Sequence, residues 1–193
     1  AGVGLALWYP YRKEAGRMFR REAVAVVGLS WLCAAVFGAL PYWFSGSLRV
    51  DFHDGWNIAC AGIFESASGF TCTGASVFSD PEHMPRAVMF WRCLTHWLGG
   101  MGIIVLFVAV LGQSGPGAKF LYSAEVPGPA CDSIEARVRD TAILMWKIYL
   151  GFSMILTILL LWEGMNLFDA LCHMFAAVAT GGFSTRNISI GYY

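Results

Sequence analysis

The sequence predicts an all-α integral membrane protein built from repeated units, in which two spanning helices flank a short re-entrant helix and its loop. The composition and the order of the apolar segments carry this prediction. Of the 193 residues, 57% are hydrophobic and only 13% are charged, with a net charge of zero. A soluble domain carries about 25% charged residues, so too few charges remain here to cover a surface in water. This balance excludes a typical cytoplasmic enzyme, and the absence of a basic excess excludes a nucleic-acid binder.

Three apolar segments are long enough to cross a bilayer, whose hydrocarbon core takes about 20 residues as helix. The range 23–40 contains no charge and is followed by the aromatic cluster Pro41–Phe44. The range 87–111 is interrupted by one arginine and one histidine, and the range 142–162 by a single lysine near its start. We expect three spanning helices.

Two further apolar stretches, 56–68 and 168–180, are too short to span and have the length of re-entrant segments. Each follows a spanning segment after a short polar connection. Each also runs into a cluster of Gly, Ser and Thr, at 68–76 and at 179–185. The order span, short helix, Gly/Thr-rich loop therefore occurs twice, which predicts an internal repeat.

The letters alone leave two registers of this repeat open. Placing Gly74 over Gly182 also pairs two serines, and placing the segment 69–71 over 182–184 matches equally well.

Basic residues predict the orientation. Five of them precede the first span, which places that segment in the cytoplasm by the positive-inside rule: Arg12, Lys13, Arg17, Arg20 and Arg21. Three more fall between the second and third spans, again on the inner side: Lys119, Arg137 and Arg139. Both short helices and their loops then enter from the outer face.

The Gly/Thr-rich loops are the candidate functional elements. Non-helical backbone at membrane depth is tolerated only where protein buries it or where it lines a water-filled path. Dehydrated potassium needs a ring of oxygen ligands, which backbone carbonyls and Thr hydroxyls supply without a full counter-charge. A short helix running inward would add the negative end of its dipole. The alternative is that both loops are only Gly-rich turns.

Segments Phe64–Ser76 and Ala179–Thr185 resemble the first and second pore loops of the TrkH/KtrB potassium transporters, and Arg92–Val105 resembles the helix after the first loop. The long 113–140 loop favours TrkH over KtrB. Such proteins have four span–pore-loop–span repeats around one potassium pathway, each giving one filter glycine. A histidine stands where we expect Gln, at position 96.

The resemblance implies that Gly74 and Gly182 are the filter glycines, which selects one of the two registers. It assigns the filter to Thr71, Cys72, Thr73, Gly74, Ala179, Thr180, Gly181 and Gly182. Potassium would be coordinated at Cys72, Thr73, Gly74, Thr180, Gly181 and Gly182. Potassium is then the transported ion, no cofactor is expected, and the protein is not an enzyme.

The domain organisation follows from the same resemblance. Residues 1–22 would end a preceding helix and add a basic cytoplasmic segment, and residues 23–112 would form a complete repeat. Residues 113–140 would be a cytoplasmic connector, and residues 141–193 a second repeat without its final span. With two loops of four, we expect the chain to be an internal piece that does not conduct alone.

The resemblance also implies a multi-pass protein of the bacterial cytoplasmic (inner) membrane, surrounded by the lipid bilayer. It implies a homodimer at full length and a TrkA-like cytoplasmic nucleotide-binding regulatory subunit as partner. No nucleic-acid partner is expected.

Two alternatives remain at this point: a polytopic membrane redox protein that uses His96 and His173, and a pore-loop channel assembled from short chains. Intramembrane ionisable residues are functional candidates by default. For Glu65 we expect a hydrogen bond that orients the loop, and for Arg92 a carboxylate or helix-end carbonyls as partners. For Gly99–Gly102 we expect close helix packing.

The cysteines have no regular spacing and are expected to be small buried residues rather than disulfide or zinc ligands: Cys33, Cys60, Cys72, Cys93, Cys131 and Cys172.

Overall fold

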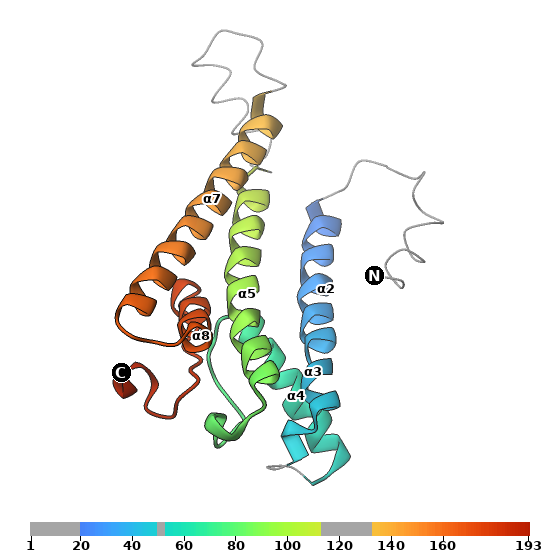
Figure 1. Cartoon of the computed structure of the whole chain (residues 1–193). Coiled ribbons are helices and arrows are strands. Elements are labelled where there is room, and N and C mark those ends of the chain that lie inside the picture. The colour runs from blue at the N-terminus through green and yellow to red at the C-terminus, as the bar shows by residue number, and fades with distance from the viewer. Residues whose placement is uncertain (1–19, 50–52, 113–132) are drawn as a thin grey trace. The chain divides into compact units, whose positions relative to one another are not determined.

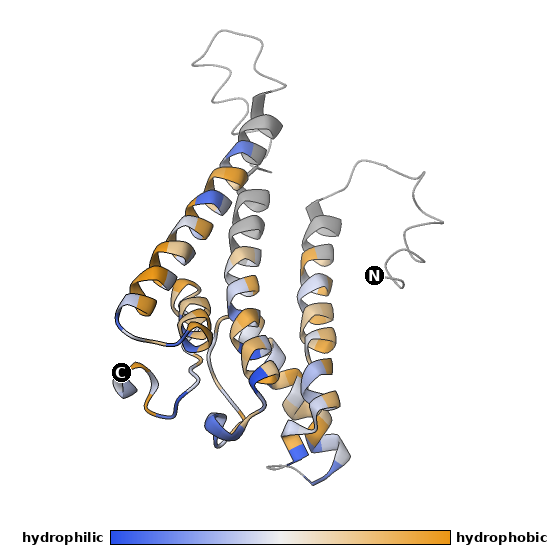
Figure 2. Ribbon diagram, in the orientation of Figure 1, coloured by the Kyte–Doolittle hydropathy of each residue, from blue (hydrophilic) through white to orange (hydrophobic). Residues whose placement is uncertain are grey.

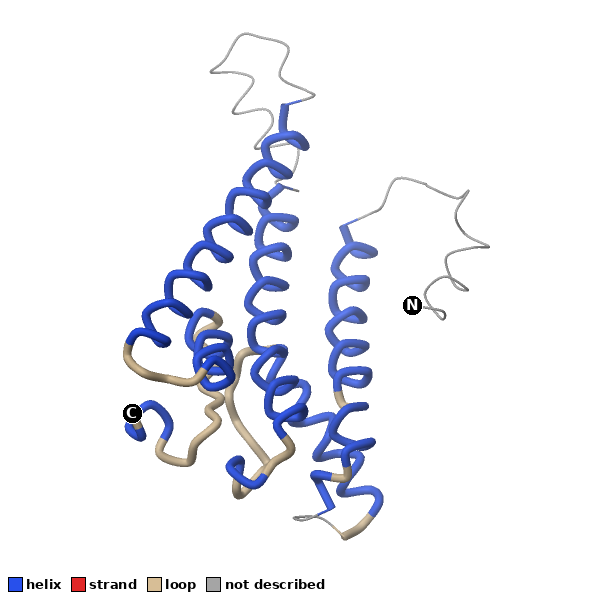
Figure 3. Tube along the Cα trace, viewed as in Figure 1, coloured by secondary structure: helices blue, strands red, loops and turns tan. Residues whose placement is uncertain are grey.

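The computed structural model describes residues 20–49, 53–112 and 133–193, and in these ranges the chain forms helices and loops without a strand (Figures 1 and 3). The longer helices are α2 (Arg20–Gly38), α4 (Gly55–Phe70), α5 (Arg86–Gly112), α7 (Ser133–Trp162) and α8 (Leu167–Val178). The shorter ones are α3 (Leu40–Ser45), η1 (Ser47–Arg49), η2 (Pro81–His83) and η3 (Ser189–Tyr192). The chain divides into two compact units, residues 1–30 and 31–193, with the boundary in the sequence of α2, and the packing below is that of the second unit.

The expected spans correspond to long helices. In the described residues, the segments Val27–Ser45 and Asp140–Trp162 are long and apolar enough to cross a membrane. The helix α5 has 27 residues, which gives it a length of about 40 Å. Its side chains beyond Gly102 lie outside the described part, so the span at 87–111 rests on sequence and helix length.

Helix α7 has an apolar surface that the rest of the chain leaves largely uncovered. Figure 2 shows it coloured mostly as hydrophobic, and Phe152, Met154 and Ile158 are 61%, 67% and 58% exposed. Soluble monomers rarely expose such a contiguous apolar surface. Lipid or additional protein must therefore cover it. The helix begins at Ser133, inside the range that the sequence assigned to a connector.

Helix α5 is at the centre of the packing. It contacts α3, α4, α7 and α8, and it runs opposite to α7 (Figure 1). One apolar core lies mainly where α5 meets α8: Met89, Cys93, Cys172, Met174, Phe175 and Phe183. A second one involves α3, α4 and the start of α5: Tyr42, Leu48, Ala61, Phe78 and Val88.

The glycines of α5 permit close contact with both short helices, as expected. A Cβ on Gly99 would collide with the backbone carbonyl of Phe70, at the end of α4. One on Gly100 would come within 3.1 Å of the Cβ of Ala179, just after α8. Both loops are thus held against the same stretch of one helix.

The expectation that the cysteines are buried is only partly correct. Cys93 and Cys172 are fully buried, but Cys33 and Cys60 are exposed. Cys33 and Cys60 lie on faces of α2 and α4 that the described chain does not cover. Residue type alone does not indicate which face of a helix other protein or lipid covers. Cys131 lies outside the described residues.

Replacing Gly99 with Ala should destabilise the full-length protein by about 1–3 kcal/mol, because the new Cβ meets backbone that cannot rotate away. Thermal unfolding in detergent measures the change. Gly151→Ala is the matched control, since Gly151 is also helical and has no atom within 4 Å of an added Cβ. It should raise the midpoint slightly. Equal effects of the two substitutions would contradict the close contact.

Candidate functional site

The two Gly/Thr-rich loops leave their short helices with the same backbone conformation. Helix α4 ends at Phe70 and α8 at Val178, and the second residue after each end is left-handed: φ is 54° at Cys72 and 55° at Thr180. Two residues later φ is positive again, 76° at Gly74 and 91° at Gly182. This correspondence pairs Gly74 with Gly182.

Equivalent hydrogen bonds hold both helix ends. The amide of Cys72 donates to the carbonyl of Gly69 and that of Thr73 to Ser68, at 3.1 and 3.0 Å. In the second loop, Thr180 donates to Ala177 and Gly181 to Ala176, at 3.0 and 2.8 Å. Paired bonds of this span form a Schellman motif, which ends a helix on a left-handed residue. Both loops therefore turn away from their helices in the same way.

The loops touch each other at their glycines. A Cβ added to Gly74 would collide with the backbone carbonyl of Gly181. Glycine is needed at Gly74 for two reasons, since φ is positive there and the second loop occupies the space of a side chain. The backbones of the two loops thus meet at Gly74 and Gly181.

Glu65 ties the segment after the first loop back to helix α4. The side chain is fully buried and accepts hydrogen bonds from the hydroxyl of Ser76, at 3.0 Å, and from the amide of Val77, at 2.9 Å. The predicted orienting role of Glu65 is confirmed. In α8, His173 stands at the same place relative to the helix end, and its Nε2 lies 3.5 Å from the hydroxyl of Thr185.

Arg92 of α5 is the charge partner of Glu65. Its Nε donates to Oε1 of Glu65 at 2.6 Å, and both side chains are almost fully buried. Its Nη1 donates to the carbonyl of Ser184 in the second loop, at 3.4 Å. The prediction of a carboxylate partner is confirmed. The carbonyl partner lies in a loop and not at a helix end.

Phe183, next to Gly182, is held by α5. The guanidinium carbon of Arg92 lies 3.7 Å from the ring centre of Phe183. The ring of His96 stacks on Phe183 at 4.0 Å, with 17° between the planes. Two planar groups cannot both lie this close on the same face without overlap, so Phe183 is clamped between them.

The stripe Arg92, Thr95, His96 and Gly99 faces both loops. A Cβ on Gly69 would collide with the hydroxyl of Thr95, and one on Gly181 with the ring of His96. The thiol of Cys72 donates to the carbonyl of His96 at 3.4 Å. Spacing of three, four and seven residues puts these positions on one helix face. That spacing was the signal which could have identified the stripe from sequence.

The two histidines of the redox alternative have packing roles here. His96 is fully buried, and within the described residues neither ring nitrogen has a hydrogen-bond partner. His173 lies beside Thr185 and makes an edge contact with Tyr193, with ring centres 6.0 Å apart. The described ranges hold no group of three or more His, Cys, Asp or Glu suited to a metal ion.

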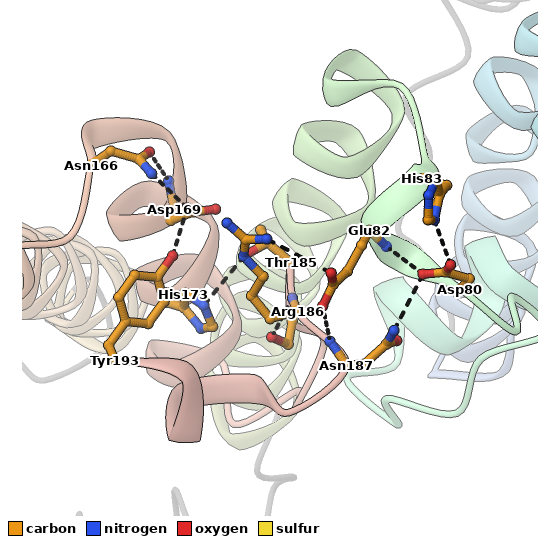
Figure 4. Close-up of polar contacts among 11 residues, drawn as sticks. Asp80, Glu82, His83, Asn166, Asp169, His173, Thr185, Arg186, Asn187 and Tyr193 are labelled. Carbon is orange, nitrogen blue, oxygen red and sulfur yellow. Dashed lines mark hydrogen bonds and ion pairs between the residues drawn. The ribbon is translucent and has the colours of Figure 1, made fainter.

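A polar network joins the segments that follow the two loops (Figure 4). Asp80 accepts from the side chain of Asn187 at 3.3 Å, and Glu82 from the amide of Asn187 at 3.1 Å. Hydrogen bonds from His83 and from the amide of Glu82 hold the pKa of Asp80 below its usual range. Arg186 lies 3.8 Å from Glu82. The segments that follow the two loops are therefore linked to each other, in addition to the contacts that both loops make with α5.

The second part of this network anchors the start of α8. Asp169 accepts hydrogen bonds from the side chain of Asn166 and from the hydroxyl of Tyr193, both at 2.6 Å. Asn166 in turn accepts from the amide of Asp169 at 3.0 Å and caps the helix.

All eight sequence-assigned filter residues lie in these two loops. The hydroxyl groups of Thr71 and Thr73 are 2.8 Å apart, and both residues are exposed, as are Thr180 and Gly182. Ala179 is buried against α5 instead. Phe183 and Ser68, whose hydroxyl donates to the carbonyl of Ala75 at 2.5 Å, were not identified from sequence.

The helical architecture and paired loops correspond to proteins of the cation-transport class. Residues 3–193 match the TrkH family model, described as a cation transport protein. The chain belongs to the TrkH family, whose members are membrane transporters and not enzymes.

Individual relatives agree with this assignment. The chain is 42% identical over 192 residues to the Trk system potassium uptake protein TrkH of Escherichia coli (strain K12), covering 99% of this chain and 38% of that protein. It is 38% identical over 194 residues to TrkG of the same organism, again covering 38% of that protein. The chain thus spans about two fifths of the length of these curated relatives.

A solved structure is also similar. The crystal structure of the potassium transporter TrkH from Vibrio parahaemolyticus matches with a TM-score of 0.77 and 32% identity, over 99% of this chain and 36% of that chain.

Replacing Glu65 with Gln should lower the stability of the full-length protein by roughly 3–5 kcal/mol, because Arg92 would remain buried without its counter-charge. Thermal unfolding measures the loss. Glu82→Gln is the matched control: it breaks the partly exposed pair with Arg186, and its effect should be much smaller. A similar loss in both variants would contradict the importance of the buried pair.

Proposed function

We propose that this chain forms part of a potassium-translocating membrane subunit, and that its two loops contribute half of a selectivity filter. Backbone carbonyls of Cys72, Thr73, Gly74, Thr180, Gly181 and Gly182 would coordinate the dehydrated ion, with Thr71 and Ala179 beginning the two loops. The ion would pass by selective conduction, without a chemical step.

The observation that carries this proposal is the meeting of two loops with one backbone conformation. Each has left-handed residues at the same two positions, and Gly74 of one lies against Gly181 of the other. Turns that merely joined helices would have no reason to match in conformation and also to touch. A filter built from repeats requires both features, since equivalent carbonyls must reach one axis.

The electrostatic potential around the loops also favours binding of a cation, and the binding stays weak enough for the ion to leave. The C-terminal ends of α4 and α8 lead directly into the loops, and each helix end carries partial negative charge. The buried carboxylate of Glu65 is neutralised by Arg92. Ligands near the ion would then be dipoles and not a full negative charge, which allows the ion to leave again.

The names of the relatives support the whole-protein context of this proposal. Potassium uptake is the named activity of the Trk proteins of Escherichia coli. In this proposal residues 23–112 are one complete span–pore-loop–span repeat, residues 141–193 belong to a second one, and residues 113–140 connect them on the cytoplasmic side. The loops enter from the outer face of a bacterial inner membrane. The full-length protein would form a homodimer and bind a TrkA-like nucleotide-binding subunit.

Replacing Gly74 or Gly182 with Ser in the full-length protein should reduce potassium over sodium selectivity by about tenfold. The left-handed conformation costs a non-glycine residue about 1–2 kcal/mol, and a change of 1.4 kcal/mol corresponds to a factor of ten. Rubidium uptake with sodium as competitor, in cells that lack other potassium uptake, measures the ratio.

Gly164→Ser is the matched control for these variants. Gly164 also has a positive φ, 95°, and no atom within 4 Å of an added Cβ, but it lies between α7 and α8, outside the loops. Its selectivity should stay unchanged. Unaltered rubidium uptake and sodium competition in both loop variants would refute the filter assignment.

A further inference from the structure

We propose that Arg92 is a positioning residue which couples the two filter loops, so that ion discrimination at one loop depends on the geometry of the other. This inference rests on the proposed filter function and assigns to it a residue outside both loops.

Arg92 makes separate contacts with each repeat. On the first-repeat side its Nε donates to Glu65 at 2.6 Å, and Glu65 accepts from the hydroxyl of Ser76 and the amide of Val77. On the second-repeat side its Nη1 donates to the carbonyl of Ser184, and its plane lies over Phe183. One guanidinium thus connects the segments immediately after both filter glycines.

The positive charge of Arg92 is neutralised by Glu65 inside the protein and is not directed at a conducted ion. The side chain is 5% exposed, and its carboxylate partner is completely buried. A conducting cation would be repelled by an unpaired guanidinium at this depth, whereas the pair with Glu65 is neutral. What Arg92 contributes to the ion path is therefore the relative position of the loops.

Only an arginine has the shape for this role. Its planar fork provides donors in two directions and a flat face for an aromatic ring. A lysine in its place retains the charge for Glu65 but provides a single ammonium group and no planar face. Arg92→Lys therefore separates the ion pair from the contacts with Ser184 and Phe183.

Because Phe183 is packed between two side chains of α5, the connection between Arg92 and the second loop is rigid. The ring is packed between Arg92 and His96, four residues apart on α5, and belongs to the core at the junction of α5 and α8. Phe183 directly follows Gly182. A movement of the Arg92 head group is consequently transmitted to the backbone of the second filter glycine.

The first test is Arg92→Lys in the full-length protein, reconstituted in liposomes of defined potassium and sodium content. The potassium over sodium uptake ratio should fall at least about fivefold, the lower end of typical coupling between two sites. Arg86→Lys is the control, because Arg86 is an exposed arginine on the first turn of the same helix, over the ring of Phe168. Its ratio should remain unchanged.

The second test is a double-mutant cycle with one mild change at each loop. Ser76→Ala removes a hydrogen bond to Glu65, and Phe183→Leu removes the ring held by Arg92. In the presence of Arg92, their effects on the uptake ratio should be non-additive by at least about twofold. In the R92K background the effects should become additive.

These outcomes separate the failure of coupling from the failure of the filter. If Gly74→Ser and Gly182→Ser change selectivity while Arg92→Lys lowers only the amount of folded protein, Arg92 is merely structural and the inference is overturned. Additive effects with Arg92 present would also overturn it. If the glycine variants themselves leave selectivity unchanged, the proposed function fails first.

Discussion

The buried ion pair between Arg92 and Glu65 is the interaction on which the arrangement of the loops depends. Two charges at this depth are costly unless they are paired and hydrogen-bonded. Glu65 meets this condition with three donors, from Arg92, Ser76 and Val77. The requirement to satisfy one carboxylate therefore fixes the position of the chain after Gly74, and a second donor of Arg92, its Nη1, extends the constraint to the second loop.

Close contacts at glycines and the packing of one aromatic ring also hold the two loops in position. Gly99 lets the carbonyl end of α4 approach the backbone of α5, and Gly181 leaves room for the imidazole of His96. Phe183 then fills the space between Arg92 and His96. The polar network around Asp80 and Asn187 secures the same two segments further along the chain.

Much of this organisation was predictable from the sequence, because it depends on local patterns. The apolar stretches at 56–68 and 168–180 predicted α4 and α8 with an error of two residues or fewer at each end, since length and hydrophobicity define such helices. The carboxylate partner expected for Arg92 was correct, whereas its carbonyl partner lies in a loop and not at a helix end. The register of the repeat needed the resemblance, since small residues in both loops allowed two alignments of similar quality.

The long-range contacts could not be predicted in the same way. Arg92 and Ser184 are 92 residues apart, and no periodicity in either segment indicates that they meet. The burial of the cysteines was predicted too broadly, because residue type alone does not say which helix face is covered. His96 shows the same difficulty: as a histidine in an apolar helix it suggested a redox ligand, whereas its neighbours make it a packing surface for Phe183.

Helix α5 follows the short helix α4 in the chain, yet it packs against α8 and Phe183 as closely as against α4. The two span–loop segments are separate in the sequence, but residues of both belong to the same apolar core. Without α8 and Phe183, one side of α5 would be uncovered, and the planar face of the Arg92 guanidinium would have no aromatic ring against it. Neither segment 31–112 nor segment 133–193 therefore buries its apolar face fully without the other.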